Sequence, residues 1–100
     1  MKKHEASLAI QVLPGVSRDE ETVRIVDEVI AYIKGRGLPL FVGPFETTIE
    51  GDFDTLWEIA RESQRICIKA GAPSVISYIK FFYNPGAGVL SIEEKTAKYH

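Results

Sequence analysis

Histidine, cysteine and clustered carboxylates are the side chains that most often do catalytic or metal chemistry, and this sequence has few of them. Its two histidines, His4 and His100, lie near the ends of the chain, and Cys67 is its single cysteine. One cysteine and two terminal histidines cannot build a zinc site of the usual ligand types. We therefore expect no enzyme, no metal and no cofactor.

A cluster of four carboxylates and a glycine-containing turn are the other candidates for chemistry. The carboxylates are those of Glu46, Glu50, Asp52 and Asp54. The two aspartates are better explained as caps of the helix that follows, and strand alternation puts the two glutamates in a different setting. Gly86–Gly88 follows the last strand and lacks the strand, loop and helix context of a nucleotide-binding fingerprint. Neither feature indicates catalysis.

The elements that must position the remaining polar side chains follow from hydrophobic periodicity. Alternating or β-rich segments predict strands over Ser7–Leu13, Leu38–Val42, Thr47–Glu50 and Val75–Tyr83. Helical spacing predicts a helix from about Arg18 to Lys34 and a second from Asp52 or Asp54 to Gly71. A capping box at Ser91 and Glu94 predicts a short helix near the end of the chain.

Each long helix also carries finer predictions. Ser17 and Glu20 have the spacing of a capping box at the start of the first helix. Four apolar residues at helical spacing predict its buried face, flanked by Ile25 and Val29: Val23, Val26, Ile30 and Ile33. In the second helix Cys67 lies within the apolar stripe, so we expect a buried thiol.

The order of the elements predicts the fold. Strand, helix, strand, strand, helix, strand with right-handed crossovers gives an antiparallel sheet in the order 4-1-3-2 with both helices on one face. The sequence thus predicts one α+β domain over residues 1–100, with ferredoxin-like βαββαβ architecture and a short C-terminal helix.

Strand alternation also predicts which side chains lie on the uncovered face of the sheet. These are the residues out of phase with the apolar core: Ser7, Ala9, Gln11, Thr48, Glu50, Ile76, Tyr78, Lys80 and Phe82, with Phe41 as a further candidate. Thr47 is expected to point inward beside Ile49. Aromatic rings gathered with a few polar groups indicate an interface or a pocket. The alternative is ordinary cross-strand packing with a functionless Glu50–Lys80 ion pair.

Composition narrows the class of partner. The chain of 100 residues is 45% hydrophobic and 26% charged, so we expect a folded domain. Its net charge is −2 and its basic residues are scattered, so we expect it to bind neither nucleic acid nor an anionic membrane. No segment has membrane-spanning length, the N-terminus lacks a signal-peptide pattern, and Cys67 has no disulfide partner. These observations predict a cytoplasmic protein.

One long motif resembles a known family. The run from Val42 to Asp52, VGPFETTIEGD, together with Gln11–Pro14 and the Gly71-Ala72 pair, resembles the thiamine-binding (YkoF-like) proteins over nearly the whole chain. The resemblance implies a ferredoxin-like fold, assembly through the sheets, and binding of thiamine or its hydroxymethylpyrimidine moiety.

The resemblance also implies where a ligand would lie. Matching the motif residue by residue points to Gln11, Thr47, Thr48 and Glu50 around it. The open-face residues Tyr78, Lys80 and Phe82 join them, because an aminopyrimidine has a flat apolar face and an edge of donors and acceptors. Within this set, Glu50 is the sharpest prediction as a ligand-recognition residue.

These observations lead to one expected function and one alternative. We expect a non-enzymatic protein that binds thiamine or a hydroxymethylpyrimidine-like small molecule. We also expect a homotetramer built as a dimer of dimers, because Ile76, Tyr78 and Phe82 would otherwise leave an apolar patch in water. The alternative is a structural or regulatory homo-oligomer without a small ligand.

Overall fold

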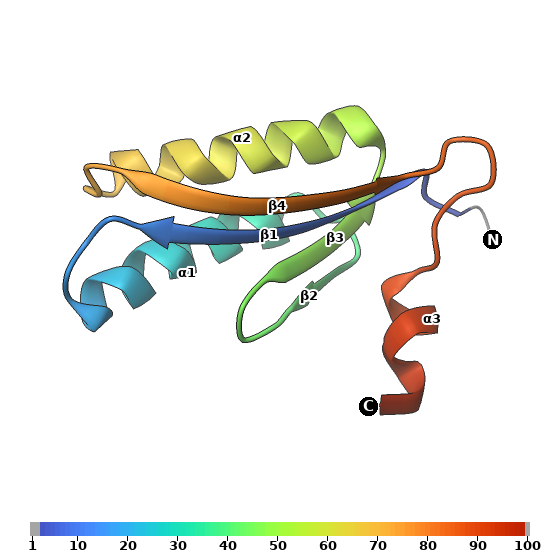
Figure 1. Cartoon of the computed structure of the whole chain (residues 1–100), viewed down its shortest axis with the longest axis horizontal. Coiled ribbons are helices and arrows are strands. Elements are labelled where there is room, and N and C mark those ends of the chain that lie inside the picture. Colours follow the sequence, from blue (N-terminus) through green and yellow to red (C-terminus); the bar gives the residue numbers. More distant parts are fainter. Residues whose placement is uncertain (1–2, 100) are drawn as a thin grey trace.

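The computed structural model describes residues 3–99 and has the predicted alternation of elements. In chain order these are β1 (Ala6–Pro14), α1 (Asp19–Gly35), β2 (Leu40–Val42), β3 (Thr47–Gly51), α2 (Phe53–Lys69), β4 (Val75–Tyr83) and α3 (Ile92–Thr96), followed by a 3-10 turn (Ala97–Tyr99). The strands form one antiparallel sheet in the order β2-β3-β1-β4, on which α1 and α2 pack (Figure 1). The predicted ferredoxin-like architecture is therefore confirmed. His100 lies outside the described residues.

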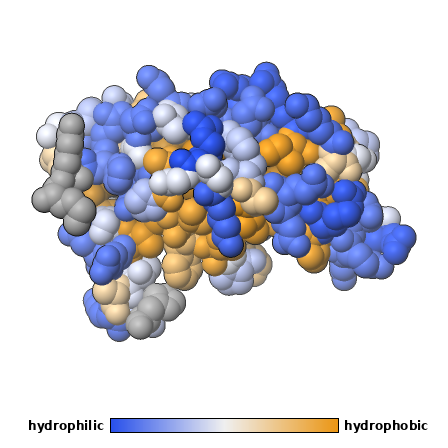
Figure 2. Space-filling model, turned by 180° about the vertical axis from the view of Figure 1, so that it is seen from behind, coloured by the Kyte–Doolittle hydropathy of each residue, from blue (hydrophilic) through white to orange (hydrophobic). Residues whose placement is uncertain are grey.

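The core lies between the sheet and the two long helices. Leu8 and Ile10 of β1 and Ile49 of β3 are buried there against Leu56 and Ile59 of α2. Burying each such side chain contributes about 1.5–3 kcal/mol. Seen from behind, hydrophobic residues gather toward the centre of the molecule between hydrophilic margins (Figure 2). Alternation along β1 sends its other residues to the opposite face, which carries the site described below.

The buried stripe of α1 differs from the predicted one. Ile25, Val29 and Ile33 face the core, whereas Val23 is 59% exposed. The predicted face is therefore wrong at Val23 and confirmed at Ile33, and the flanking residues Ile25 and Val29 belong to its buried centre. Apolar residues occupy more than one stripe of this helix, so its packing on the sheet decides which stripe is buried.

The start of α1 is also not as predicted. The helix begins at Asp19, with Arg18 in the N-cap position and no side chain accepting a capping hydrogen bond. Glu20 instead forms an ion pair with Arg18 at 2.8 Å. The predicted capping box of Ser17 and Glu20 is therefore wrong, because the helix starts one position later than that box requires.

α2 begins and packs as predicted. Asp52 is its N-cap, with Oδ2 accepting a hydrogen bond from the Thr55 backbone N–H at 3.0 Å. The side chain and N–H of Thr55 hold the pKa of the Asp52 carboxyl below its usual value. Cys67 is fully buried on the inner side of the helix, and burial raises the pKa of its thiol.

α3 lies beside β3 and is fixed by backbone contacts at its start. The predicted capping box is confirmed: the Ser91 hydroxyl accepts from Glu94 N–H at 3.0 Å, and the Glu94 carboxylate accepts from Ser91 N–H at 2.9 Å. That second hydrogen bond holds the pKa of Glu94 below its usual value. Just before the helix, Val89 N–H donates to the His4 carbonyl at 3.0 Å. Within residues 3–99, no helix combines the length and apolar character needed to cross a membrane.

Candidate functional site

The candidate site lies on the sheet face that α1 and α2 leave uncovered, here called the open face. Ala9 in the central strand β1 is opposite Thr48 of β3 and Lys80 of β4, and Thr48 is in turn opposite Phe41 of β2. Directly opposed residues of antiparallel strands point to the same side of a sheet. The register therefore forms one row of side chains across all four strands. Ser7, opposite Phe82, begins the next row.

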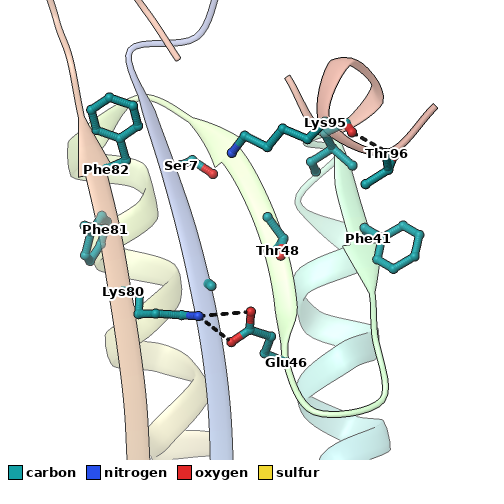
Figure 3. Close-up of a pocket in the computed structure, with 11 residues that line it drawn as sticks. Ser7, Phe41, Glu46, Thr48, Lys80, Phe81, Phe82, Lys95 and Thr96 are labelled. Carbon is teal, nitrogen blue, oxygen red and sulfur yellow. Dashed lines mark hydrogen bonds and ion pairs between the residues drawn. The ribbon is translucent and has the colours of Figure 1, made fainter. Parts of the chain in front are cut away.

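A pocket of about 310 Å³ lies over these two rows, between the open face and α3 (Figure 3). Its size is at the small end of the range for ligand pockets. Residues of the sheet and of the loop before β3 form most of its lining: Ser7, Ala9, Phe41, Glu46, Thr48, Lys80, Phe81 and Phe82. α3 supplies the remainder: Ile92, Lys95 and Thr96. The lining thus combines aromatic rings, hydroxyls and charges of both signs around the small Ala9.

An ion pair lies at one end of the pocket. Lys80 Nζ is 3.1 Å from Glu46 Oε1 and donates to Oε2 at 3.3 Å (Figure 3). Both side chains are solvent-accessible, so the pair itself contributes at most about 1 kcal/mol to stability. Its donors and acceptors remain close to the open volume of the pocket. The sequence-based alternative of a Glu50–Lys80 pair is wrong, because Glu50 lies one row farther along β3, opposite Ser7.

Glu50 is on the open face but lies beneath the C-terminal segment. It is 5% exposed, and its Oε2 accepts a hydrogen bond from the backbone N–H of Ile92 at 3.1 Å. Ile92 is the first residue of α3 and also lines the pocket. Glu50 therefore holds in place the helix that forms one wall of the site.

The predicted site residues divide into three groups. Thr48, Lys80 and Phe82 line the pocket under α3. Gln11 and Thr47 instead line a second hollow of about 210 Å³ between α1 and the turn that joins β2 to β3. Thr47 is on the helix-covered side, opposite Ile10 of β1, as its inward orientation predicted.

The third group lies outside both hollows. Tyr78 is opposite Gln11 and exposed on the open face, and Glu50 is covered by α3 as described. The second hollow has a largely aliphatic lining from α1 and β1; its polar residues are Gln11, Thr22, Thr47 and Glu46, which borders both hollows. It has one aromatic ring, that of Phe45, and no cation, whereas the pocket under α3 has three aromatic rings and two lysines. The pocket under α3 is therefore the better candidate for ligand recognition.

Sequence reasoning predicted three of the eleven lining residues as site residues and missed the other eight, among them Glu46, Ala9 and Lys95. Glu46 is part of the long motif and could have been found there. Ala9 had been placed on the open face, but its small size carried no signal until its neighbours were known. Lys95 could not have been found from local pattern, since only the packing of α3 beside β3 brings it to the pocket.

Within residues 3–99 no group of three or more histidine, cysteine, aspartate or glutamate side chains could hold a metal ion. The chemistry available in the pocket is thus that of hydrogen bonding, charge and aromatic contact. Such a lining is suited to binding a small polar heterocycle.

The chain as a whole is similar to proteins of one known family. The model of the family described as thiamine-binding protein matches residues 8–100. The chain belongs to this family. A UPF0045 protein of Clostridium perfringens is 44% identical over 93 residues, which cover 93% of this chain and 95% of the relative.

Two solved structures extend the comparison to three dimensions. A Bacillus cereus domain of unknown function is 35% identical, with a TM-score of 0.84 over 95% of this chain and 89% of its own. A Thermotoga maritima protein described as a candidate thiamine biosynthesis or salvage protein is 29% identical, with a TM-score of 0.81 over 95% of this chain and 98% of its own. This chain thus shares its fold with both proteins.

Proposed function

We propose that the pocket under α3 binds thiamine or its hydroxymethylpyrimidine moiety, and that the protein carries or senses this ligand without transforming it. The observation that carries the proposal is the lining of the pocket. Phe41 and Phe82 lie on opposite sides of a floor formed by Ala9, and Glu46 and Lys80 lie at one end. Membership of the thiamine-binding family and the likeness to the Thermotoga protein support the choice of ligand.

The chemistry of an aminopyrimidine fits this arrangement. Its flat ring can pack against aromatic side chains, and its edge carries an amino donor beside ring-nitrogen acceptors. The Glu46 carboxylate can accept from the amino group, and the Lys80 ammonium can donate to a ring nitrogen. Glu50 acts in this proposal by fixing α3 through Ile92, rather than by touching the ligand.

Replacing Glu46 by glutamine tests the proposal. Hydrogen bonds to charged groups contribute about 1.5–3 kcal/mol, so Glu46→Gln should weaken binding of hydroxymethylpyrimidine by roughly tenfold to a hundredfold. Calorimetric titration of thiamine and hydroxymethylpyrimidine into both proteins measures this. Glu93→Gln is the matched control, because Glu93 lies exposed on α3 and does not line the pocket. Equal affinities in wild type and Glu46→Gln would contradict the assignment.

The open face beyond the pocket supports the further proposal of a homotetramer built as a dimer of dimers. Ile76 is 61% exposed there, Tyr78 is exposed two residues farther along β4, and Phe82 is exposed at the pocket under α3. An apolar surface of this kind on a sheet is typical of an interface. The same observation favours the second candidate function, a structural or regulatory homo-oligomer. The absence of a disulfide partner for Cys67 is compatible with a cytoplasmic location, which we propose with it.

Light scattering at micromolar concentration tests the assembly. The wild type is expected to exceed the mass of a monomer, and Ile76→Lys is expected to shift the population toward smaller species because a lysine in an apolar interface is unfavourable. Val23→Lys is a matched control, since Val23 has nearly the same exposure but lies on α1, away from the open face. A monomeric wild type, or equal masses for both variants, would contradict assembly through the sheet.

A further inference from the structure

One end of the pocket has polar groups that recognition of a pyrimidine edge does not use. Ser7, Thr48 and Lys95 all line the pocket, and Ser7 lies in the row of side chains next to the one that contains Lys80. Figure 3 shows the Lys95 side chain extending from α3 across β3, with its ammonium group toward the Ser7 hydroxyl. The Glu46–Lys80 pair lies at the other end.

Ser7 is the most enclosed of these three residues. It is 7% exposed in the middle of the sheet, and its hydroxyl makes no hydrogen bond within residues 3–99, although it borders the pocket. The hydroxyl opens onto the pocket, so it is available to pair with a polar group that enters the pocket.

The charges around the pocket leave a single cation without a partner. The Glu46 carboxylate pairs with Lys80, and the Glu50 carboxylate accepts from Ile92 N–H. Across the part of the chain that the structure describes, Lys95 has neither an ion pair nor a hydrogen bond. The end of the pocket that contains Ser7 thus combines a hydroxyl with an uncompensated ammonium, and the Thr48 hydroxyl lies in the neighbouring row. These groups are donors suited to phosphoryl oxygens.

We propose that the pocket takes its pyrimidine as a phosphate monoester, with Ser7, Thr48 and Lys95 binding the phosphate. This inference rests on the proposed function and names the chemical class of its ligand. The two ends are about one side-chain repeat of a strand apart, roughly 7 Å, a length that a six-membered ring and a methylene–oxygen bridge can span.

Calorimetric titration of hydroxymethylpyrimidine and its phosphate monoester into wild type and Lys95→Gln tests the inference. The wild type is expected to bind the phosphate ester at least tenfold more tightly than the alcohol. Lys95→Gln should lose most of this preference and keep its affinity for the alcohol within about twofold. Ser7→Ala should reduce the preference by a smaller factor, since it removes a neutral donor. Lys98→Gln is the matched control, because Lys98 lies in the turn after α3, over the ring of Tyr99, and does not line the pocket.

The outcomes separate this inference from the proposed function. Equal affinities for alcohol and ester in the wild type, or a preference that survives Lys95→Gln, would overturn the phosphate subsite and leave pyrimidine binding in place. Binding of neither compound would overturn the proposed function and the inference together. A preference that disappears in Lys95→Gln and persists in Lys98→Gln supports both.

Discussion

Replacing Ala9 by phenylalanine is expected to weaken binding of hydroxymethylpyrimidine or its phosphate by at least a hundredfold. Ala9 is at the centre of the pocket floor, opposite both Thr48 and Lys80. The space above it exists because the central strand has a methyl group where its neighbours have longer side chains. An aromatic ring at this position would fill the part of the pocket in which we place the pyrimidine.

The same substitution should leave the fold intact. Ala9 points to the open face rather than the core, and phenylalanine is favoured in strands, so the free energy of unfolding should change by less than about 1 kcal/mol. Ala9→Ser provides the control, because it keeps the residue small and should bind within a few-fold of wild type. Calorimetric titration measures the affinities, and unfolding in urea measures the stability. Wild-type affinity in Ala9→Phe would show that the ligand lies elsewhere.

The largest effect on stability is expected from α1. Ile25→Ala removes a fully buried side chain, which should lower the free energy of unfolding by about 2–5 kcal/mol. Val23→Ala, two residues earlier on the same helix, removes a side chain that is mostly in water. It should change the free energy of unfolding by no more than about 0.5 kcal/mol. Denaturant unfolding of both variants compares the two positions directly. A large loss in Val23→Ala with little in Ile25→Ala would contradict the orientation of the helix.

The strands and their order followed from the sequence, because alternation has only two phases. Once Leu8 and Ile10 are placed in the core, Ser7 and Ala9 must lie on the other face, and the cost of burying Lys80 sets the phase of β4 in the same way. A helix is not limited to two orientations in this way, so the buried face of α1 did not follow from its sequence. With both Val23 and Ile25 apolar, helical spacing admitted more than one buried stripe, and contact with the sheet selected among them.

The candidate site was only partly predictable, for a related reason. Thr48, Lys80 and Phe82 are brought together by strand pairing, and the alternation pattern carries that information. Lys95 and the enclosure of Glu50 depend on where α3 packs, through a hydrogen bond between residues 42 positions apart. Local pattern does not encode such a contact. The motif that carries the family resemblance likewise borders two hollows, since Thr47 and Thr48 point to opposite faces of one strand.

A crystal structure of the protein grown with hydroxymethylpyrimidine phosphate shows directly where the ligand binds. We expect the pyrimidine over Ala9 between Phe41 and Phe82, with its amino edge at Glu46 and its phosphate near Lys95. Ligand in the hollow beside Gln11 and Thr47, with the pocket under α3 filled by solvent alone, would contradict this expectation.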